Sequence, residues 1–419
     1  MAGGSGYSFN IREVLIMKGR SMRIGMMTDT YKPYVSGITN YIELNKRYLE
    51  KAGHEVYVFA FSEPDHVDNE QRVIRSPGLP LSDTGFHLSL RYSREAKKLL
   101  QSMDVVHVHH PFLSGRLALH YCRPAGIPVV FTNHTRYDLY AQAYLPLLPG
   151  QVSEGLLRAY MPSFCEAVNL VISPSAGMEK ILRELAVDSH IEVVPNGVEL
   201  TRFFEAEPLS RAHYGFTEDN ILLIYTGRLG PEKNLEFLLL AFAGVVQAVE
   251  KARLLIVGDG PLTENLKELT SDLQITNAAK FAGLIPYENM PGYLAMCDVF
   301  VTASVTEVHS LSVIEAMGVG LPVMGIRSPG IGDTVEDGVT GFLSTKNLPA
   351  FTAKLTRLCL QTQFRQRMGK AARKTSRKYD IERTTNIMLE HYDRLASESR
   401  QRKPDWDERL LAILERFRI

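Results

Sequence analysis

The feature that most constrains this chain is a repeated alternation of short apolar runs with longer helical patterns. In the first half the runs of strand length are MRIGMMTD, HEVYVFAF, DVVHVHH, PVVFTNH, LVIS and IEVVPNG. Short buried strands that alternate with helices indicate a parallel, doubly wound α/β sheet. Ligands of such sheets bind beyond the carboxyl ends of the strands. We therefore expect a site at the strand ends near Gly37, His109, His110 and His134.

A second series of the same kind begins after the polar segment FFEAEPLSRAHYGF. Its expected strands are NILLIYTG, ARLLIVGDG, AAKFAGL, CDVFVTAS and LPVMG, and its expected helices lie near 234–250, 262–273, 287–296 and 311–318. A chain of 419 residues exceeds what one hydrophobic core usually supports, so two domains are expected. With a boundary near Phe204, residues 22–204 and 205–389 form two Rossmann-like domains, and the carboxyl ends of both sheets should line the cleft between them.

The two ends of the chain lie outside this repeat. Residues 1–21 lack the uninterrupted apolar core of a signal peptide, so we expect a poorly ordered extension there. From Leu348 the pattern is helical to the end, and helices from about 390 to 419 are expected to pack back on the first domain. The final stretch, DERLLAILERFRI, is strongly amphipathic, which suits either packing or contact with a membrane surface.

Composition limits the classes of partner and cofactor. A formal net charge of zero argues against bulk attraction to nucleic acid. No apolar run reaches the roughly 18 to 20 residues of a spanning helix, so any membrane contact would be made from the surface. The cysteines are scattered and form no CxxC pair, so the sequence suggests neither a zinc site nor a disulfide framework, and reduced cysteines in a cytoplasmic compartment fit best. They are Cys122, Cys165, Cys297 and Cys359.

The segment SVTEVHSLSVIEAMGVGLPVMG, residues 304–325, combines two carboxylates with a helix start. Ser310 and Ser312 are possible N-caps of the short helix LSVIEAM. Glu307 then lies in the loop before the helix, and Glu315 lies about one turn inside it. A helix N-terminus receives phosphate, and carboxylates accept hydrogen bonds from sugar hydroxyls. The segment predicts a polyhydroxy, phosphate-bearing ligand; the alternative is a solvated surface helix.

Two further strand-to-helix turns carry residues suited to phosphate. TGRLGPEKN places Arg228 and Lys233 beside Gly227 and before a helix. A planar guanidinium and a mobile ammonium together suit a diphosphate, although solvated loop charges are the alternative. VGDGP, with Gly258, lacks the full GxGxxG spacing. Phosphate binding and a tight turn that needs positive φ are therefore equally open there.

Taken together, GRLGPEKN, VGDGP, PNGVE and TEVHSLSVIEAMGVGLPV resemble the GT-B retaining nucleotide-sugar glycosyltransferases of family 4. The mark of that family is two glutamates separated by seven residues, as Glu307 and Glu315 are. MRIGMMTDTYKPYVSGITNYI and DVVHVHHPFLSG resemble the branch with diacylglycerol glucosyltransferases and sulfoquinovosyl transferases. The resemblance covers residues 22 to about 392. It implies a GT-B fold of two Rossmann-like domains that face each other, and a metal-independent transferase without a cofactor beyond its UDP-sugar substrate.

The resemblance also implies roles for matching positions. Arg228 and Lys233 would hold the donor diphosphate and neutralise the leaving nucleoside diphosphate. Glu315 would accept hydrogen bonds from the ribose, while Glu307 and His134 would contact the donor sugar from the two domains. The catalytic set is therefore His134, Glu307, Arg228 and Lys233. The other expected donor-binding positions are Gly37, Asn196, Gly227, Gly258, Leu284, His309, Ser310, Leu311 and Glu315.

Three of these positions carry open alternatives. A histidine after a buried strand, such as His134, is often only hydrogen-bonded locally. Many family members have glycines between the first glutamate and the helix, whereas this chain has Val308, His309 and Ser310. Either Ser310 adds a hydroxyl donor there or the loop takes another path. His109 and His110 could line the acceptor side, but no ligand pattern supports a metal site.

The acceptor is expected over the first domain. There LSLRYSREAKKLL spaces Arg91, Arg94, Lys97 and Lys98 to share one broad helical side. A basic amphipathic surface binds anionic lipid headgroups, and a solvated helix face is the alternative.

The branch resemblance implies transfer of glucose from UDP-glucose to diacylglycerol by a peripheral enzyme at the inner face of the cell membrane. The alternatives are a glycan, a phosphoinositide or another small molecule as acceptor, or a non-catalytic nucleotide-sugar-binding protein. The sequence carries no signal for an oligomeric state and none for a nucleic-acid partner.

Overall fold

The structure is a computed structural model, and it describes residues 20–34, 36–62, 68–80, 87–89, 91–139 and 150–401. The predicted extension, apart from Arg20 and Ser21, lies outside these residues, as does the amphipathic stretch DERLLAILERFRI.

The first domain is built on a seven-stranded parallel sheet with the order β3-β2-β1-β6-β7-β8-β9. Its strands are β1 (Arg23–Met27), β2 (Glu55–Ser62), β3 (Val73–Pro77), β6 (Val105–Val108), β7 (Val129–Thr132), β8 (Leu170–Ser173) and β9 (Ile191–Val193). Every residue of β6, β7 and β8 is buried, because helices cover both faces of the sheet. Those helices are α1 (Gly37–Lys51), α2 (Arg94–Leu100), α3 (Leu113–Cys122), α5 (Gly150–Ala167) and α6 (Ala176–Glu184). A short antiparallel pair, β4 (Leu79–Pro80) and β5 (His87–Leu88), forms a separate ribbon.

The second domain repeats this plan on a six-stranded parallel sheet with the order β12-β11-β10-β13-β14-β15. Its strands are β10 (Ile221–Thr226), β11 (Ala252–Val257), β12 (Ala279–Gly283), β13 (Val299–Thr302), β14 (Val323–Ile326) and β15 (Gly341–Ser344). Its helices are α8 (Leu235–Ala248), α9 (Thr263–Asp272), α10 (Met290–Ala295), α11 (Leu311–Val319), α12 (Pro329–Thr334), α13 (Leu348–Leu360) and α14 (Thr362–Ser376). The predicted α/β class with two Rossmann-like domains is confirmed.

Both sheets reverse their strand order at their first strand. In the first sheet β1 lies between β2 and β6, and in the second β10 lies between β11 and β13. At such a switch point the connections leave on opposite sides, which opens a crevice beyond the carboxyl ends of the two central strands. The loops after β1 and β6, and those after β10 and β13, are therefore the places to look for a site.

The chain crosses between the domains twice. The first crossing runs from β9 to β10 and includes α7 (Thr201–Phe204), so the predicted boundary lies within it. The second leads into α15 (Ile381–Gln401), whose start is tied to the first crossing. Val198 N–H donates to Tyr379 O at 2.9 Å, and Ile381 N–H donates to Val198 O at 3.0 Å. The two crossings therefore run side by side at the joint.

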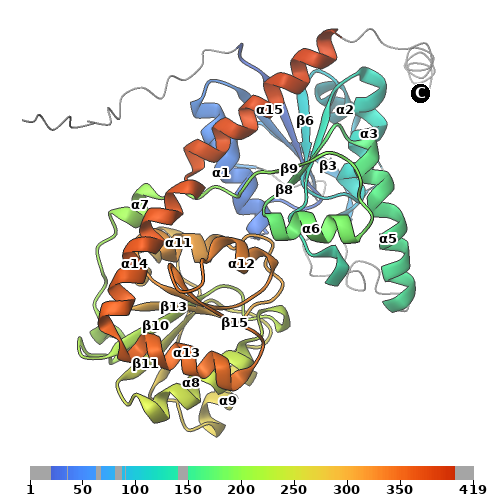
Figure 1. The fold of residues 1–419 in the computed structure, drawn as a ribbon. Coiled ribbons are helices and arrows are strands. Elements are labelled where there is room, and N and C mark those ends of the chain that lie inside the picture. Colours follow the sequence, from blue (N-terminus) through green and yellow to red (C-terminus); the bar gives the residue numbers. More distant parts are fainter. Residues whose placement is uncertain are drawn as a thin grey trace, which may run out of the picture.

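α15 returns across the first domain, as Figure 1 shows in red against the blue and green elements. It packs on α1 and buries Met388, Tyr392 and Leu395 in the same hydrophobic cluster as Ile24 and Met26 of β1. The helix itself starts at Ile381, and its first residues in this cluster are Ile387 and Met388, close to the expected position near 390. Among the described residues, no helix has the length and apolar character that crossing a membrane requires.

Candidate active site

Glu307 and Lys233 meet at the switch point of the second sheet. Glu307 lies in the loop between β13 and α11, and Lys233 ends the short turn η4 (Pro231–Lys233) that follows β10. Lys233 Nζ lies 2.6 Å from Glu307 Oε1, and the two side chains are 23% and 19% exposed. Burial by itself would raise the pKa of Glu307, but the Lys233 ammonium and a hydrogen bond from Ser304 hold this pKa below its usual value. The pair is thus an ionised contact at the predicted position.

Side chains of neighbouring residues fix the two loops to each other. Asn234 adopts a left-handed conformation with φ 54°, which asparagine tolerates better than most residues. Its Nδ2 donates to Ala303 O at 3.3 Å, at the end of β13. Thr306 Oγ1 donates to Glu232 O at 3.4 Å. The Lys233–Glu307 geometry is therefore supported on both sides by hydrogen bonds between the same two loops.

Gly227 and Gly258 allow the ends of β10 and β11 to lie against each other. Both have positive φ, 147° and 134°, and a Cβ on Gly258 would lie 2.0 Å from Gly227 O. Glycine is required there because no side chain fits such an approach. The tight-turn interpretation of VGDGP is thus supported, and phosphate binding at that turn stays a prediction.

Arg228 is the more exposed of the two predicted donor-binding cations. Its side chain is 62% exposed, and its Nη1 lies 4.0 Å from Glu232 Oε1. The Tyr225 hydroxyl donates to the Arg228 carbonyl at 3.1 Å, which fixes the backbone of the loop while the guanidinium extends into solvent. Lys233 is thus fixed by an ion pair, whereas Arg228 is available to an anion.

Glu315 is buried in the first turns of α11, at 6% exposure. The Tyr287 hydroxyl donates to Glu315 Oε1 at 2.6 Å, and the Arg202 guanidinium lies 5.0 Å from the Tyr287 ring centroid. Burial raises the pKa of Glu315 to about 7, although the Tyr287 hydrogen bond and Arg202 act in the opposite direction. Tyr287 follows the 78%-exposed Leu284 in the loop after β12.

Sequence reasoning missed Tyr287 and Arg202. Tyr287 could have been found from the sequence, because it lies three residues beyond Leu284 in the same strand-end loop. Arg202 could not, because it belongs to the first crossing between the domains. Only the fold brings Arg202 to the Tyr287 ring.

The loop of Val308, His309 and Ser310 packs into the joint between the domains. Val308 is 6% exposed and belongs to the hydrophobic cluster of the first domain. Ser175 Oγ donates to Val308 O at 2.9 Å, and Asn196 Nδ2 donates to His309 O at 3.2 Å. Residues of the first domain and of the first crossing thus hold the loop that carries Glu307. Of the residues that stand in place of the family's glycines, Val308 contributes its side chain to this packing.

The other side chains of this loop also contact the protein, although Nδ1 of His309 is buried without a hydrogen-bond partner. His309 packs edge-on against Tyr379 with the ring centroids 5.0 Å apart, and burial lowers the pKa of His309 to about 4. Ser310 is the N-cap residue of α11, but its hydroxyl makes no cap bond and lies 3.1 Å from Ser312 Oγ. Leu311 then starts the helix. A sugar contact from His309 or Ser310 stays a prediction.

A second contact at the joint lies between α6 and α12. Gly177 N–H donates to Asp333 Oδ2 at 2.6 Å. A Cβ at Gly177 would lie 2.8 Å from Pro329 Cα, so the close packing of these two helices depends on that glycine.

In the first domain, His134 lies beyond β7 and contacts His109 beyond β6. His109 Nδ1 and His134 Nε2 are 3.0 Å apart, and the Tyr41 ring packs edge-on at 4.6 Å from the His134 ring. Burial, with the neighbouring imidazoles, lowers the pKa of both histidines well below the usual value, so both rings are neutral at pH 7. The local hydrogen bond expected as the alternative is present. That bond involves Nε2 of His134 and not its Nδ1, so contact between Nδ1 and a sugar stays a prediction.

Gly37 is the first residue of α1, which is capped by the Ser36 hydroxyl accepting from Thr39 N–H at 3.1 Å. A Cβ at Gly37 would meet no described atom within 4 Å. Packing within the described protein therefore does not require glycine at this position, and close approach of a ligand stays the predicted reason.

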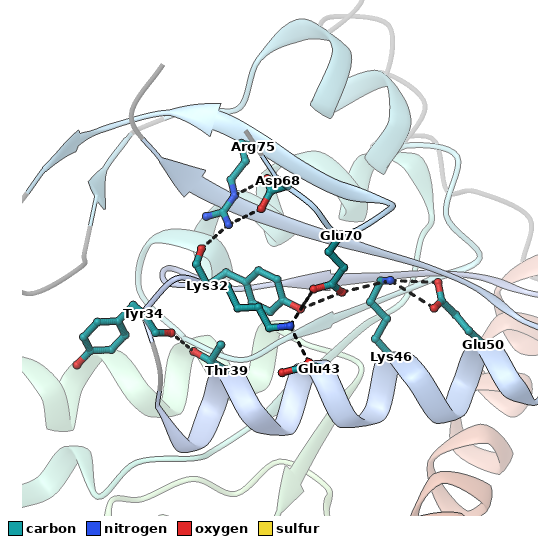
Figure 2. A network of polar contacts seen from close by, with 10 residues as sticks. Lys32, Tyr34, Thr39, Glu43, Lys46, Glu50, Asp68, Glu70 and Arg75 are labelled. Carbon is teal, nitrogen blue, oxygen red and sulfur yellow. Dashed lines mark hydrogen bonds and ion pairs between the residues drawn. The ribbon is translucent and has the colours of Figure 1, made fainter. Parts of the chain in front are cut away.

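The loop that leads to Gly37 is held by a network of ion pairs, shown in Figure 2. Lys32 Nζ lies 2.7 Å from Glu43 and 3.2 Å from Glu70. The buried Lys46 lies 3.3 Å from both Glu50 and Glu70. These pairs connect the loop after β1 to α1 and to the segment before β3, beside a hollow of about 560 Å³. The network fixes the path of the loop.

Fewer exposed cations lie on α2 than the sequence predicted. Arg91 precedes Ser93, the N-cap residue of α2, so it is not part of the helix. Lys97 is half-buried and lies 5.2 Å from the Tyr121 ring centroid. Arg94 and Lys98 are exposed on the helix. The expectation that all four cations share one helical side was therefore wrong, because the helix starts later and one lysine packs on an aromatic ring.

Comparison with known proteins agrees with this geometry. Residues 35–202 match the family described as Glycosyltransferase Family 4, and residues 207–375 match Glycosyl transferases group 1. An alpha-monoglucosyldiacylglycerol synthase from Streptococcus pneumoniae is 30% identical over 338 residues, which are 77% of this chain and 75% of the relative. The chain belongs to the family 4 glycosyltransferases.

Another family 4 relative and a solved structure extend the comparison. The sulfoquinovosyl transferase SQD2 from Arabidopsis thaliana is 30% identical over 376 residues, 86% of this chain and 71% of the relative. The crystal structure of Anabaena Alr3699/HepE in complex with UDP-glucose matches with a TM-score of 0.68 at 19% identity, covering 89% of this chain and 100% of the other. At that identity the match shows the fold, which is GT-B.

Proposed function

We propose that this family 4 glycosyltransferase transfers glucose from UDP-glucose to diacylglycerol, with retention of configuration, at a membrane surface. The observation that carries the proposal is the ionised Lys233–Glu307 pair at the switch point of the second sheet, 2.6 Å apart. It combines a cation for a diphosphate with a carboxylate for sugar hydroxyls, at the crevice where doubly wound sheets bind nucleotides.

The second domain would hold the charged part of the donor. When the bond from the sugar to the diphosphate breaks, negative charge develops on the leaving diphosphate, and fixed cations stabilise it. Lys233 supplies one such cation, and the exposed Arg228 supplies a planar fork that matches two phosphate oxygens. Glu315 would accept hydrogen bonds from the ribose hydroxyls, and the exposed backbone near Leu284 would meet the base.

The first domain would contact the sugar. Its strand ends carry neutral imidazoles and amides, which exchange hydrogen bonds with hydroxyls without the desolvation cost of burying charge. His134 would therefore face the hexose while Glu307 binds hydroxyls from the opposite side.

Two of the relatives support a lipid acceptor. Alpha-monoglucosyldiacylglycerol synthases from Streptococcus pneumoniae and from Acholeplasma laidlawii are each 30% identical to this chain. The exposed cations Arg94 and Lys98 of α2 would bring the enzyme to anionic headgroups, which attract basic residues near the surface. Contact with the membrane would thus be peripheral.

The test is a transfer assay with UDP-glucose and vesicles that contain diacylglycerol and an anionic phospholipid. We expect a glucosyl diacylglycerol whose anomeric configuration, read by NMR, is that of the donor. Lys233→Met should lose most of the activity, and Lys251→Met, which removes an exposed lysine, is the matched control. Transfer to a soluble acceptor such as an inositol phosphate, with none to the lipid, would contradict the proposed acceptor. Absence of turnover with any donor would contradict the proposed enzyme.

A further inference from the structure

Buried histidines form a hydrogen-bonded group beneath the first domain's half of the site. His107 lies within β6 and His109 directly follows it, with the ring centroids 4.3 Å apart, and His109 contacts His134, which follows the neighbouring strand β7. No cluster of three or more His, Cys, Asp or Glu side chains in the described ranges is arranged to hold a metal ion. The rings contact one another and nearby hydroxyls, so the direction of each hydrogen bond is the property to work out.

We propose that His109 is a positioning residue that fixes His134 as the tautomer protonated on Nδ1, so that His134 presents a hydrogen-bond donor to the sugar. This inference rests on the proposed function for the identity of the ligand. The tautomer itself is a property of the protein alone.

The state of His109 Nε2 decides which of the two rings donates the hydrogen bond between His109 and His134. His109 is fully buried, and its Nε2 has no hydrogen-bond partner. A neutral imidazole carries one N–H and one lone pair. An unpaired buried N–H is rarer than an unpaired buried acceptor, so the unpartnered Nε2 should carry the lone pair. His109 Nδ1 then carries the proton and donates it to His134 Nε2 at 3.0 Å.

His134 is left with its proton on Nδ1. The tautomer of a histidine is set by the hydrogen bond that its other nitrogen makes, and here Nε2 must accept from His109. His134 is the partly exposed member of the pair. A ligand atom opposite Nδ1 must therefore accept a hydrogen bond, as a hydroxyl oxygen does.

A chain of hydrogen bonds behind the pair has a consistent direction. Tyr392 of α15 lies 2.5 Å from His107 Nδ1, and His107 Nε2 lies 2.7 Å from Thr132 Oγ1. A phenol donates to an imidazole, so His107 carries its proton on Nε2 and donates to Thr132. Thr132 in turn bonds the hydroxyl of Tyr41, whose ring packs on His134. The helix that returns from the second domain therefore contributes to the orientation of His134.

His110 supplies an internal reference of the opposite tautomer. Asp29 N–H donates to His110 Nδ1 at 3.2 Å, so that nitrogen must hold a lone pair and Nε2 must carry the proton. Two histidines next to each other in the sequence are thus expected to be protonated on different nitrogens.

The first test reads the tautomers directly in the ligand-free protein labelled with ¹⁵N-histidine. Two-bond couplings from the carbon-bound ring protons to the nitrogens distinguish Nδ1–H from Nε2–H, and His→Gln variants assign the signals. We expect Nδ1–H for His109 and His134, and Nε2–H for His110. Protonation of His134 on Nε2 would overturn the inference. Since neither donor nor acceptor is present, a failure of the proposed function would leave this result unchanged.

The second test compares two replacements of His109. His109→Asn keeps a side-chain N–H near the position of Nδ1, whereas His109→Leu keeps only the bulk. Loss of a group that orients an imidazole costs about 10- to 100-fold in activity for metal-binding histidines, and we expect a similar fall in kcat for the leucine variant. The asparagine variant should recover most of it, and UDP affinity should stay constant in both. Equal loss in the two variants, or none in the leucine variant, would contradict a positioning role.

Discussion

Both domains place their site residues at the carboxyl ends of parallel strands, but the site residues of the second domain are charged and those of the first are neutral. In the second domain the strand ends carry an ionised pair, Lys233 with Glu307, and the exposed Arg228. In the first domain His109 follows β6, the counterpart of β13, and His134 follows the next strand, β7; burial keeps both rings neutral. The fold therefore sets where a ligand lies, and the residues at the strand ends set which part of it each domain binds.

This difference matches the two ends of a nucleotide sugar. A diphosphate needs fixed positive charge, whereas a hexose needs many neutral hydrogen-bond partners. The site residues of the two domains differ in the same way. Variants of Arg228 and Lys233 should therefore affect nucleotide binding, and variants of His134 should affect the chemical step.

The largest effect is expected for Lys233→Met. It removes the cation from the leaving group and leaves Glu307 buried without its partner, so kcat/KM should fall by about 10²- to 10³-fold. The free energy of unfolding should fall by about 3 kcal/mol, because one member of a largely buried pair is lost. Steady-state kinetics and denaturant titration measure the two effects.

The double variant Lys233→Met with Glu307→Gln separates stability from catalysis. Removing both charges should restore most of the lost stability while activity stays low. Recovery of activity along with stability would mean that Lys233 only supports the loop.

His134→Ala is expected to lower kcat by about 10- to 100-fold, because a group that contacts the reacting sugar is lost. The affinity for UDP should change less than twofold, since UDP lacks the hexose that His134 would contact. Steady-state kinetics give kcat, and inhibition by UDP gives the affinity for the nucleotide. His120→Ala, on α3, is a matched control. A large loss of UDP affinity would show that the first domain also binds the nucleotide.

Glu315 makes nucleotide binding depend on pH. Its pKa is raised to about 7, so it is mostly protonated at pH 6 and mostly ionised at pH 8. Only the ionised form accepts hydrogen bonds from both ribose hydroxyls with both oxygens, so affinity should rise by about tenfold between these values. Measuring UDP affinity against pH tests this, and Glu315→Gln should not show the rise. Any pH dependence that remains in that variant comes from ionisation of the nucleotide itself. An identical pH profile for both proteins would contradict the assignment.

Val308→Gly, which restores the family's glycine, is expected to have the smallest effect on activity, a few-fold at most. It removes a buried valine from the first domain's core and should cost about 2 kcal/mol of stability. Val339→Gly, at a 43%-exposed valine in a turn, is the control. Thermal unfolding and kinetics measure both. If activity rose, Val308 would be restraining the loop rather than positioning it.

The strands of both sheets follow from the sequence because short apolar runs end at polar, glycine-containing turns. β3 and β15 escaped notice because VIRSP carries a central arginine and GFLS has only two large apolar residues, between a glycine and a serine. Glu307, Glu315, Arg228 and Lys233 could be predicted because each stands in a local motif.

The contacts of the joint could not be predicted from local motifs. The role of Val308 depends on Ser175, 133 positions earlier in the chain, and Tyr392 reaches His107 across 285 positions. Local patterns do not encode such pairs. The sequence shows that Val308, His309 and Ser310 replace the family's glycines. Only the structure shows that this loop packs into the joint between the domains.

Calorimetric titration of UDP into the unmodified protein, Lys233→Met and His134→Ala tests the division between the domains most directly. We predict that UDP binds the unmodified protein and His134→Ala with the same affinity, and binds Lys233→Met at least tenfold more weakly, since a charge-assisted contact to phosphate contributes about 1.5 kcal/mol or more. An equal loss of UDP affinity in both variants would contradict the account.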